Sequence, residues 1–194
     1  MKYSTKRFIT LSIWCASIIF AFRLILSWQE LNVMITCTKI FELGYSIFGF
    51  IGESITVAAF LMFVFNKWAW KWKLIRLLHS VPILHNRYLG TFVSDYDHKE
   101  RNGELIINQT FLNISVVFNT AESSSRSITA TIDNRDDLQR LIYTYQNEPK
   151  GEIQDRSPIH YGTAILDVTK PNEIGGNYYT GRKSRGSMTF TCKM

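Results

Sequence analysis

The stretch Leu43–Phe65, LGYSIFGFIGESITVAAFLMFVF, decides the architecture of this chain. It is apolar except for Glu53, and at ~1.5 Å of rise per residue a helix of this length spans roughly 30 Å, the thickness of the hydrocarbon core of a bilayer. A second apolar stretch, Phe8–Trp28, precedes it and carries one charge, at Arg23. The two stretches predict a hairpin of membrane-spanning helices.

Basic residues lie at the outer flanks of this hairpin, whereas the connecting residues Gln29–Glu42 contain only Lys39. The flanking residues are Lys2, Lys6 and Arg7 before the first stretch, and Lys67, Lys71, Lys73 and Arg76 after the second. The positive-inside rule then predicts both termini in the cytoplasm and a short external turn. A cleaved signal peptide is disfavoured because a second apolar stretch follows and a small-x-small cleavage pattern is missing.

The run Lys67–Lys73, KWAWKWK, alternates aromatic and cationic residues directly after the second span. Indole rings favour the headgroup zone of a bilayer, and lysine ammonium groups favour anionic phosphates. This Trp/Lys collar is expected to fix the depth of the second helix. It would act either as a plain interfacial anchor or as a lever that transmits movement.

Glu53 shares a helix face with small and polar residues, at a depth where a charge costs about 2.5–3.5 kcal/mol. That face consists of Ser46, Gly49, Gly52, Thr56 and Ala59. Small residues let helices approach closely in a bilayer. Two interpretations stay open. In one, Arg23 points outward and Glu53 is protonated or hydrated; in the other, Arg23, Gly49, Gly52, Glu53 and Thr56 form an assembly site, with Glu53 paired within one hairpin or between neighbours.

After Arg76 the sequence changes to short alternating runs that end at turn residues. The predicted strands are Arg87–Asp95, Glu104–Gln109, Leu112–Asn119, Ser125–Ile132, Leu138–Gln146, Ile159–Val168, Ile174–Gly181 and Ser187–Lys193. Turn signals are read at Asn102-Gly103, at Gly175-Gly176, between Gly181 and Gly186, and at Pro149-Lys150-Gly151. Residues 136–145 also fit a helical period, although their Tyr-Thr-Tyr tract favours a strand.

An open sheet would leave the backbone groups of its two edge strands unpaired, and eight strands in so short a domain avoid this when the sheet closes on itself. The predicted fold is therefore an N-terminal α-helical transmembrane hairpin followed by an all-β domain, a closed eight-stranded antiparallel barrel. A β-sandwich is the alternative. The β half has no Trp but seven Tyr, and tyrosine combines a stacking surface with a hydroxyl that suits a flat polar ligand.

Catalytic constellations are missing from the sequence. The four histidines lack zinc-ligand spacing, and neither a Walker pattern nor a nucleophilic Ser elbow is found. Only Cys192 lies in the β half, which excludes a disulfide within it and fits an intracellular location. Asp136-Asp137 is typical of a solvated turn. We expect no enzyme activity, no metal site and no cofactor.

The net charge of +6 is unevenly placed. Up to Lys73 the chain has eight Lys/Arg and three Glu, and afterwards fourteen Lys/Arg and thirteen Asp/Glu. The basic excess belongs to the membrane flanks, so a nucleic-acid polymer is not an expected partner.

The stretch Gly175–Gly186, GGNYYTGRKSRG, is the best candidate for recognition. On a strand, Tyr178, Thr180 and Arg182 point to one face and Tyr179 to the other. An aromatic ring, a hydroxyl and a guanidinium on one face can stack a base and bind a phosphate. The same residues are also ordinary for an exposed hairpin tip.

The order of these parts resembles a known family. The residues that carry the resemblance are the two spans, Tyr88-Leu-Gly-Thr91, Leu141–Pro149 (LIYTYQNEP), His160–Leu166 (HYGTAIL), and Gly176–Arg182 (GNYYTGR) with Gly186. The chain is similar along essentially its whole length to the two-transmembrane, β-strand-rich membrane effectors of bacterial cyclic-oligonucleotide antiphage systems (CBASS), the CD-NTase-associated protein 15 family.

The resemblance implies an antiphage defence effector with two parts. Residues 1–76 would form the membrane region, and residues 77–194 a cytoplasmic barrel that binds a cyclic dinucleotide made by a CD-NTase. Binding would drive homo-oligomerisation of the helices among the lipids of the bacterial inner membrane, membrane disruption, and cell death or growth arrest. The implied ligand-binding residues are Tyr88, Thr91, Tyr143, Tyr145, Tyr178, Thr180 and Arg182.

Two alternatives stay open: a membrane-anchored lipocalin-like barrel that binds a lipid, and a purely structural subunit. The polarity of the barrel interior discriminates between them. Polar strand residues would line a cavity poorly suited to acyl chains, or would equally well form the solvent face. These residues are Asn113, Ser115, Asn119, Thr129 and Thr131.

Overall fold

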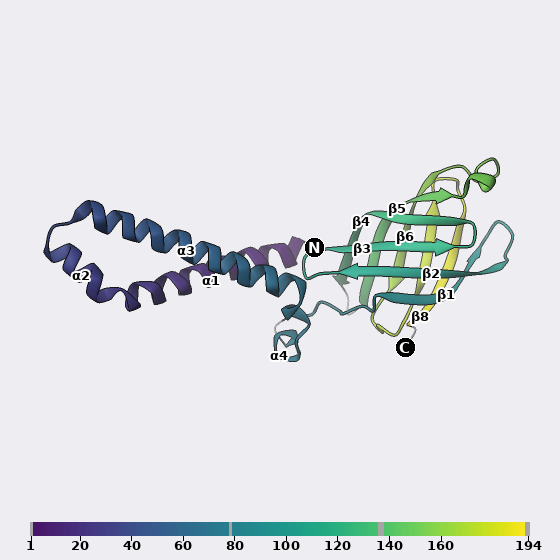
Figure 1. Ribbon diagram of the computed structural model, residues 1–194. Helices are drawn as coiled ribbons and strands as arrows, with labels where there is room; N and C mark the ends of the chain where they lie inside the picture. The colour runs from purple at the N-terminus through teal and green to yellow at the C-terminus, as the bar shows by residue number, and fades with distance from the viewer. Residues whose placement is uncertain (1, 78, 136–137, 193–194) are drawn as a thin grey trace. The chain divides into compact units, whose positions relative to one another are not determined.

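The computed structural model describes residues 2–77, 79–135 and 138–192, which form two compact units, Lys2–Trp72 and the chain from Lys73 onward (Figure 1). The first unit is helical. Its elements are α1 (Lys2–Leu26), α2 (Trp28–Thr36), α3 (Ile40–Lys67) and a short 3-10 helix, η1 (Ala69–Lys71). Helix α4 (Lys73–Arg76) begins the second unit, which contains every strand.

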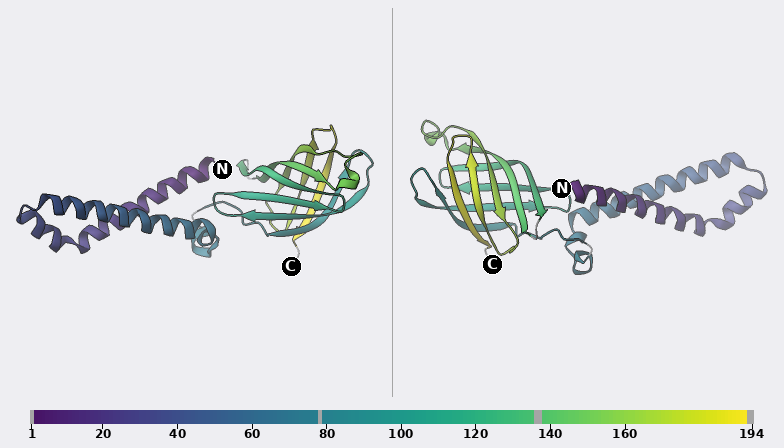
Figure 2. Two further views of the ribbon diagram at one scale, coloured as in Figure 1. Left: turned by 45° about the horizontal axis from the view of Figure 1, so that its top comes forward. Right: turned by 180° about the vertical axis from the view of Figure 1, so that it is seen from behind.

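Helices α1 and α3 run antiparallel, side by side, and both are long and apolar enough to cross a membrane (Figures 1 and 2). The predicted helical hairpin is therefore confirmed. The connection differs from the expected short turn, because α2 occupies most of it. The segment Trp28–Thr36 contains neither Gly nor Pro, so nothing stops the helix. The chain reverses at Thr38, whose positive φ of 59° marks a left-handed backbone.

One face of α3 packs inside the hairpin, where Ser54, Ala58 and Met62 are buried at a spacing of four residues. At the edge of this face the Arg23 Nε donates to the Glu53 Oε2 at 3.0 Å. The Arg23 Nη1 also donates to the Ser27 hydroxyl at 2.7 Å. Glu53 is thus paired within a single hairpin, one of the two arrangements that the sequence left open.

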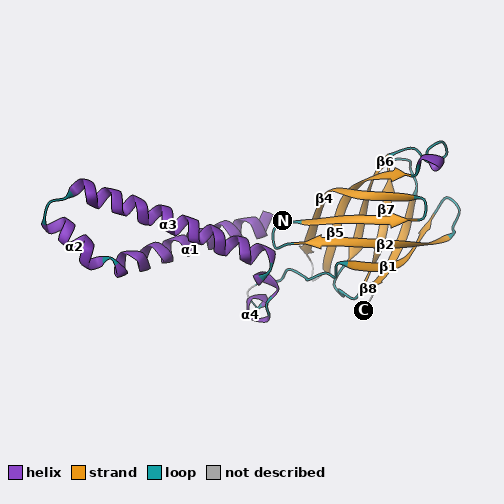
Figure 3. Cartoon of the chain, in the orientation of Figure 1, coloured by secondary structure: helices purple, strands orange, loops and turns teal. Residues whose placement is uncertain are grey.

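The second unit is a closed antiparallel barrel of eight strands in sequence order, with β1 paired to β8 (Figure 3). The predicted barrel is confirmed and the sandwich is excluded. The strands are β1 (Arg87–Ser94), β2 (Glu100–Gln109), β3 (Ile114–Thr120), β4 (Ser123–Arg135), β5 (Leu138–Pro149), β6 (His160–Asp167), β7 (Glu173–Thr180) and β8 (Arg185–Cys192). A 3-10 helix, η2 (Gly151–Ile153), lies between β5 and β6.

The predicted turns divide into correct and wrong ones. Gly181 begins the turn between β7 and β8, and Pro149 ends β5, as expected. Asn102-Gly103 and Gly175-Gly176 instead lie inside β2 and β7, so these two predictions were wrong. The ambiguous stretch is a strand from Leu138 onward. Residues 136 and 137, for which a solvated turn was expected, lie outside the described residues.

Alternate residues of the strands face a common apolar core. Its fully buried members include Leu105, Leu141, Leu166, Ile174 and Phe190. The barrel has two ends with different connections. We call "mouth" the end with the β1–β2, β3–β4, β5–β6 and β7–β8 connections, and "base" the end where the chain enters β1 and where β2–β3 and β6–β7 connect.

Candidate ligand-binding site

A cavity of about 750 Å³ opens at the mouth of the barrel, a size typical of sites for small ligands. All four mouth connections contribute to its rim, through Tyr96 and Asp97, Ala121 and Glu122, Ser157, and Arg182 and Ser184. Aromatic and apolar side chains form the layer below, namely Phe92, Phe118, Tyr145, Tyr178 and Met188. The barrel thus ends in a cup with an apolar bottom and a polar rim.

Two glycines let this cup exist. Tyr145 pairs with Gly162 across β5 and β6, and Tyr178 pairs with Gly186 across β7 and β8. A Cβ atom at Gly162 would overlap the Tyr145 ring, and one at Gly186 the Tyr178 ring. The rings therefore lie against the barrel wall, where a side chain would otherwise stand, and the centre of the mouth stays open.

Both tyrosine hydroxyls stay protonated at physiological pH. Burial raises the pKa of Tyr145, and the neighbouring Tyr178 raises it further. Burial also raises the pKa of Tyr178, against the smaller lowering effect of a hydrogen bond with Ser94. Each phenol can therefore offer a ligand a ring surface and a neutral hydroxyl donor.

The wall above the tyrosines is polar and internally ordered. The buried Ser125 hydroxyl donates to the Asn147 Oδ1 at 2.8 Å, which fixes the orientation of this amide and directs its NH₂ group to act as a donor. The hydroxyls of Thr180 and Ser184 are 2.7 Å apart across the β7–β8 turn. Amide and hydroxyl groups of this kind read the polar edge of a base.

Two guanidinium groups lie at the rim. Arg182 donates from Nη1 to the Ser157 hydroxyl at 2.6 Å. Arg101 holds the Asp97 carboxylate through both of its terminal nitrogens. The hydrogen bond from Arg101 lowers the pKa of Asp97 to about 2, so the pair is ionised at physiological pH. A carboxylate held in this bidentate way occupies the position that a phosphate takes on an arginine.

The arrangement is one of recognition: two guanidiniums, two phenols, and ordered amide and hydroxyl groups around an open cup. Within residues 2–77, 79–135 and 138–192, no group of three or more His, Cys, Asp and Glu side chains is placed to hold a metal ion.

Comparisons with known proteins place this barrel in a family. Residues 80–192, which cover every strand, match the family model of the Cap15 cyclic dinucleotide receptor domain. The chain belongs to the Cap15 family. It is also 30% identical over 159 residues to CD-NTase-associated protein 15 of Staphylococcus schleiferi, a match that covers 81% of this chain and 85% of that protein. The resemblance read from the sequence is thus confirmed.

Four of the ligand-binding residues predicted for this Cap15 chain line the mouth cavity: Tyr145, Tyr178, Thr180 and Arg182. They come from β5, β7 and the β7–β8 turn, which closure of the barrel brings together. Tyr179, on the opposite strand face, is half exposed on the outside. The alternation of β7 therefore orients its side chains as the sequence indicates.

The other three predicted residues lie elsewhere. Tyr88 is fully buried at the base, where its hydroxyl donates to the Pro171 carbonyl at 2.7 Å. Thr91 lies on the outer side of β1, beside Asn102 and Glu104. Tyr143 is buried one layer below Tyr145, with the two ring centres 5.8 Å apart. None of these three lines the cavity formed by the described residues.

Tyr143 carries a buried hydroxyl for which the described residues supply no hydrogen-bond partner. Burying such a group without a partner costs about 1–3 kcal/mol. We expect Tyr143→Phe to stabilise the ligand-free protein by about 1 kcal/mol and to raise Tm by about 4 °C. Thermal unfolding of the full chain in detergent measures this, with Tyr179→Phe on the outer face as the matched control. A lower Tm for Tyr143→Phe would mean that this hydroxyl is satisfied in solution.

Sequence reasoning missed Arg101, Ser125, Asn147 and His160 as cavity residues. The sequence did contain a signal, because strand residues that are an even number of positions apart lie on the same face. Arg101 is four residues from the apolar Leu105 and Asn147 is two residues from Tyr145, so both lie on the inward face of their strands. Asn119 shows why the signal went unread. It was a candidate for a polar lining but lies on the outer side, where its Oδ1 accepts from the Ser124 hydroxyl.

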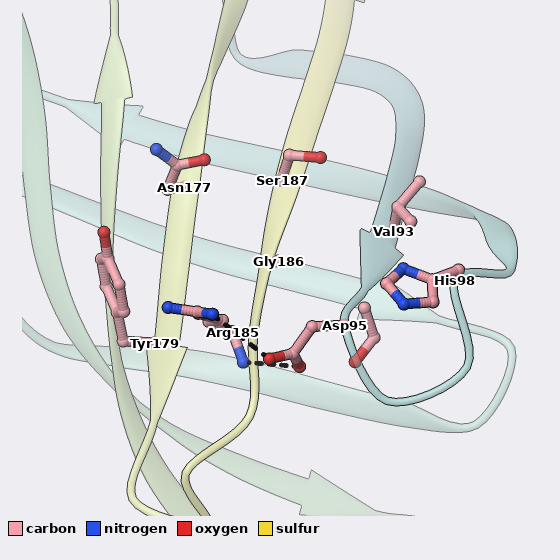
Figure 4. Close-up of a pocket in the computed structure, with 9 residues that line it drawn as sticks. Val93, Asp95, His98, Asn177, Tyr179, Arg185, Gly186 and Ser187 are labelled. Carbon is pink, nitrogen blue, oxygen red and sulfur yellow. Dashed lines mark hydrogen bonds and ion pairs between the residues drawn. The ribbon is translucent and has the colours of Figure 1, made fainter.

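A second, smaller hollow of about 380 Å³ lies on the outer side of β1, β7 and β8 (Figure 4). Its two charged residues pair with each other: the Asp95 carboxylate accepts from the Arg185 backbone N–H at 3.0 Å and pairs with the Arg185 Nε at 3.4 Å. Tyr179 stands at its edge. The mouth cavity has about twice the volume and four loops around it, so it is the stronger candidate for the ligand site of this Cap15 barrel.

The residues predicted for membrane assembly fall into two groups, one paired inside the hairpin and one exposed. Arg23 and Glu53 pair inside the hairpin. Gly49, Gly52 and Thr56 are exposed, and a Cβ atom at either glycine would meet nothing within 4 Å. At about 100° per residue, Gly52 and Thr56 point away from the buried face that carries Ser54 and Ala58. The face of α3 that carries Gly49, Gly52 and Thr56, here called the glycine face, is therefore not covered within the hairpin.

Proposed function

We propose that the chain is a membrane-anchored receptor of the CBASS antiphage system, whose mouth cavity binds a cyclic dinucleotide. The observation that carries this proposal is the cup itself: about 750 Å³, ringed by Arg101 and Arg182, in the domain that matches the Cap15 receptor family. A cyclic dinucleotide has two phosphates and two bases. Two guanidiniums supply charge-assisted hydrogen bonds for the phosphates, and Tyr145 and Tyr178 supply ring surfaces for the bases.

The polar wall argues against a lipid carrier. The Asn147 side chain in this wall is buried with its NH₂ group directed to act as a donor, and an acyl chain would cover that group without giving it a hydrogen bond. The relative from Staphylococcus schleiferi is named for its association with a CD-NTase. An enzyme of that kind is the expected source of the ligand.

A thermal-unfolding screen of the full chain in detergent tests this proposal. The probes are cyclic di-adenylate, cyclic di-guanylate, the mixed cyclic dinucleotide, a linear dinucleotide and oleate. A cyclic dinucleotide at a hundred times its Kd stabilises the folded state by about 2.7 kcal/mol, whereas the linear control at the same concentration should have a smaller effect. Stabilisation by oleate alone would replace the receptor with a lipid-binding barrel.

Asp97 is expected to compete with the ligand for Arg101. The pair is partly exposed, and the net contribution of such a pair is small. Asp97→Asn should therefore tighten binding of the cyclic dinucleotide about two- to fivefold by calorimetry. Glu122→Gln is the matched control, because Glu122 lines the same rim but pairs with Arg156. Equal gains in both variants would show that only the overall charge of the rim matters.

The remaining parts of the proposal concern the membrane. Residues 1–76 would form a two-span region of the bacterial inner membrane and residues 77–194 a cytoplasmic sensor, with both termini inside because the basic residues flank the spans. The bound barrel would then drive homo-oligomerisation through the open face of α3, disrupt the membrane, and stop growth or kill the cell. Support comes from the two apolar helices and from the unfilled glycine face. No catalysis is part of this function.

A further inference from the structure

We propose that residues 80–86, here called the base segment, are the element that passes ligand binding from the barrel to the helices. This inference rests on the proposed function. The segment lies between α4 and β1 and ends directly before β1, so in sequence it stands between the membrane region and the strands of the sensor. It forms an integral part of the barrel, and the family match likewise begins at residue 80.

Leu84 anchors the segment from within. Its side chain is 6% exposed and belongs to the same core cluster as Tyr88, Leu105 and Phe190. The segment therefore closes the base of the barrel, as the loops surround the mouth at the other end. Pulling it away would expose Leu84 and the apolar core beneath it to water, which is unfavourable.

Gln109, the last residue of β2, holds the backbone of the segment in two places. The Leu84 N–H donates to the Gln109 Oε1 at 3.0 Å, and the Gln109 Nε2 donates to the Pro82 carbonyl at 2.8 Å. These two hydrogen bonds from one amide side chain thus take the place of a pair of backbone hydrogen bonds between neighbouring strands. Asn86 adds to this side, because its Nδ2 donates to the Ile107 carbonyl at 3.1 Å.

The other base connections hold the segment too. The Tyr88 hydroxyl accepts from the His85 N–H at 3.0 Å while it donates to Pro171 in the β6–β7 connection. Further along, the Gln139 Nε2 in β5 donates to the Ser80 carbonyl at 3.3 Å. A change in the relative positions of these strands must therefore move the segment.

Strand β2 connects the two ends directly. It begins in the mouth, where Arg101 lines the cavity, and ends at Gln109 on the segment. These residues are eight apart on one strand face, about 26 Å at ~3.3 Å per residue. When a ligand phosphate replaces Asp97 on Arg101, the mouth end of β2 shifts. A packed barrel wall transmits such a shift along the strand and does not absorb it locally.

The test separates binding from output in the full chain, reconstituted in anionic vesicles filled with dye. Gln109→Leu keeps the side-chain size but removes both hydrogen bonds. We expect its Kd for the cyclic dinucleotide to stay within about twofold of the unmodified protein, and ligand-triggered dye release to fall at least tenfold. Gln146→Leu, on an outward-facing position of β5, is the matched control and should release dye normally.

A second variant guards against misfolding of Gln109→Leu. Insertion of Gly-Ser-Gly-Ser after Leu77 keeps every contact of the base segment but loosens its link to α4. Mechanical transmission predicts normal binding with lost dye release. If both variants bind ligand and release dye as the unmodified protein does, the inference is wrong and the proposed function stands. If the unmodified protein neither binds nor releases dye, both are wrong.

Discussion

Arg182→Ala should weaken binding of the cyclic dinucleotide about tenfold to a hundredfold while leaving the barrel folded. Arg182 lies in the exposed β7–β8 turn and lines the mouth cavity. A hydrogen bond to a charged group contributes about 1.5–3 kcal/mol, which corresponds to this range of Kd. Calorimetry on the full chain in detergent measures it. Because the contact is ionic, the difference between the variant and the unmodified protein should shrink as the salt concentration rises.

Arg185→Ala is the matched control for this experiment. Arg185 lies three residues further on, carries the same charge, and belongs to the outer hollow with Asp95. Its loss should change Kd less than twofold. If Arg185→Ala weakened binding and Arg182→Ala did not, the ligand site would move from the mouth to the outer hollow of Figure 4.

The fold was predictable because its strands alternate cleanly, and the errors in placing turns in the β half came from glycine. Gly103 and Gly176 were read as turns but lie inside strands, where neighbours approach too closely for a Cβ atom. At Gly103 the close neighbour is the Phe118 ring, and at Gly176 it is the Ile165 backbone. A sequence shows that a residue is glycine, but not whether φ or space requires it.

The sequence did not show how far along the barrel axis each inward-facing residue lies, and this limited the prediction of the candidate site. Tyr88, Tyr143 and Tyr145 all point inward, and the sequence treats them alike. Only Tyr145 reaches the cavity, because Tyr88 is the second residue of β1, at the base, and Tyr143 lies one layer below Tyr145. The strand period fixes the face of a residue, whereas its height depends on register between neighbours. Register is a tertiary property, which also explains why Arg101 and Asn147 were missed.

The helices show the same division between local and tertiary information. The charges at Arg23 and Glu53 stood out because a bilayer disfavours them, and their heights along two antiparallel helices allowed a pair. The sequence did not show which face of α3 meets α1, because Ser54 and Ala58 are small residues just as Gly49 and Gly52 are. The structure assigns Ser54 and Ala58 to the hairpin. It thereby frees the glycine face.

Gly52→Leu should abolish ligand-triggered assembly and dye release while leaving ligand binding unchanged. Gly52 is exposed and a Cβ atom there would meet nothing within 4 Å, so we expect the single hairpin to accept the substitution. Between two copies, however, glycine permits a close backbone approach that leucine blocks. We expect at least a tenfold loss of dye release from vesicles. We also expect loss of the oligomer that chemical crosslinking would detect for the unmodified protein with ligand.

Gly44→Leu is the matched control for this last prediction, since it makes the same change on the same helix. Gly44 also has open space around its Cβ position, but lies roughly 80° around the helix from Gly52. It should assemble and release dye normally. Equal loss in both variants would mean that α3 tolerates no added bulk on any exposed side. Equal activity in both would contradict the glycine face as the contact, and would leave the paired Arg23 and Glu53 with a role inside one hairpin only.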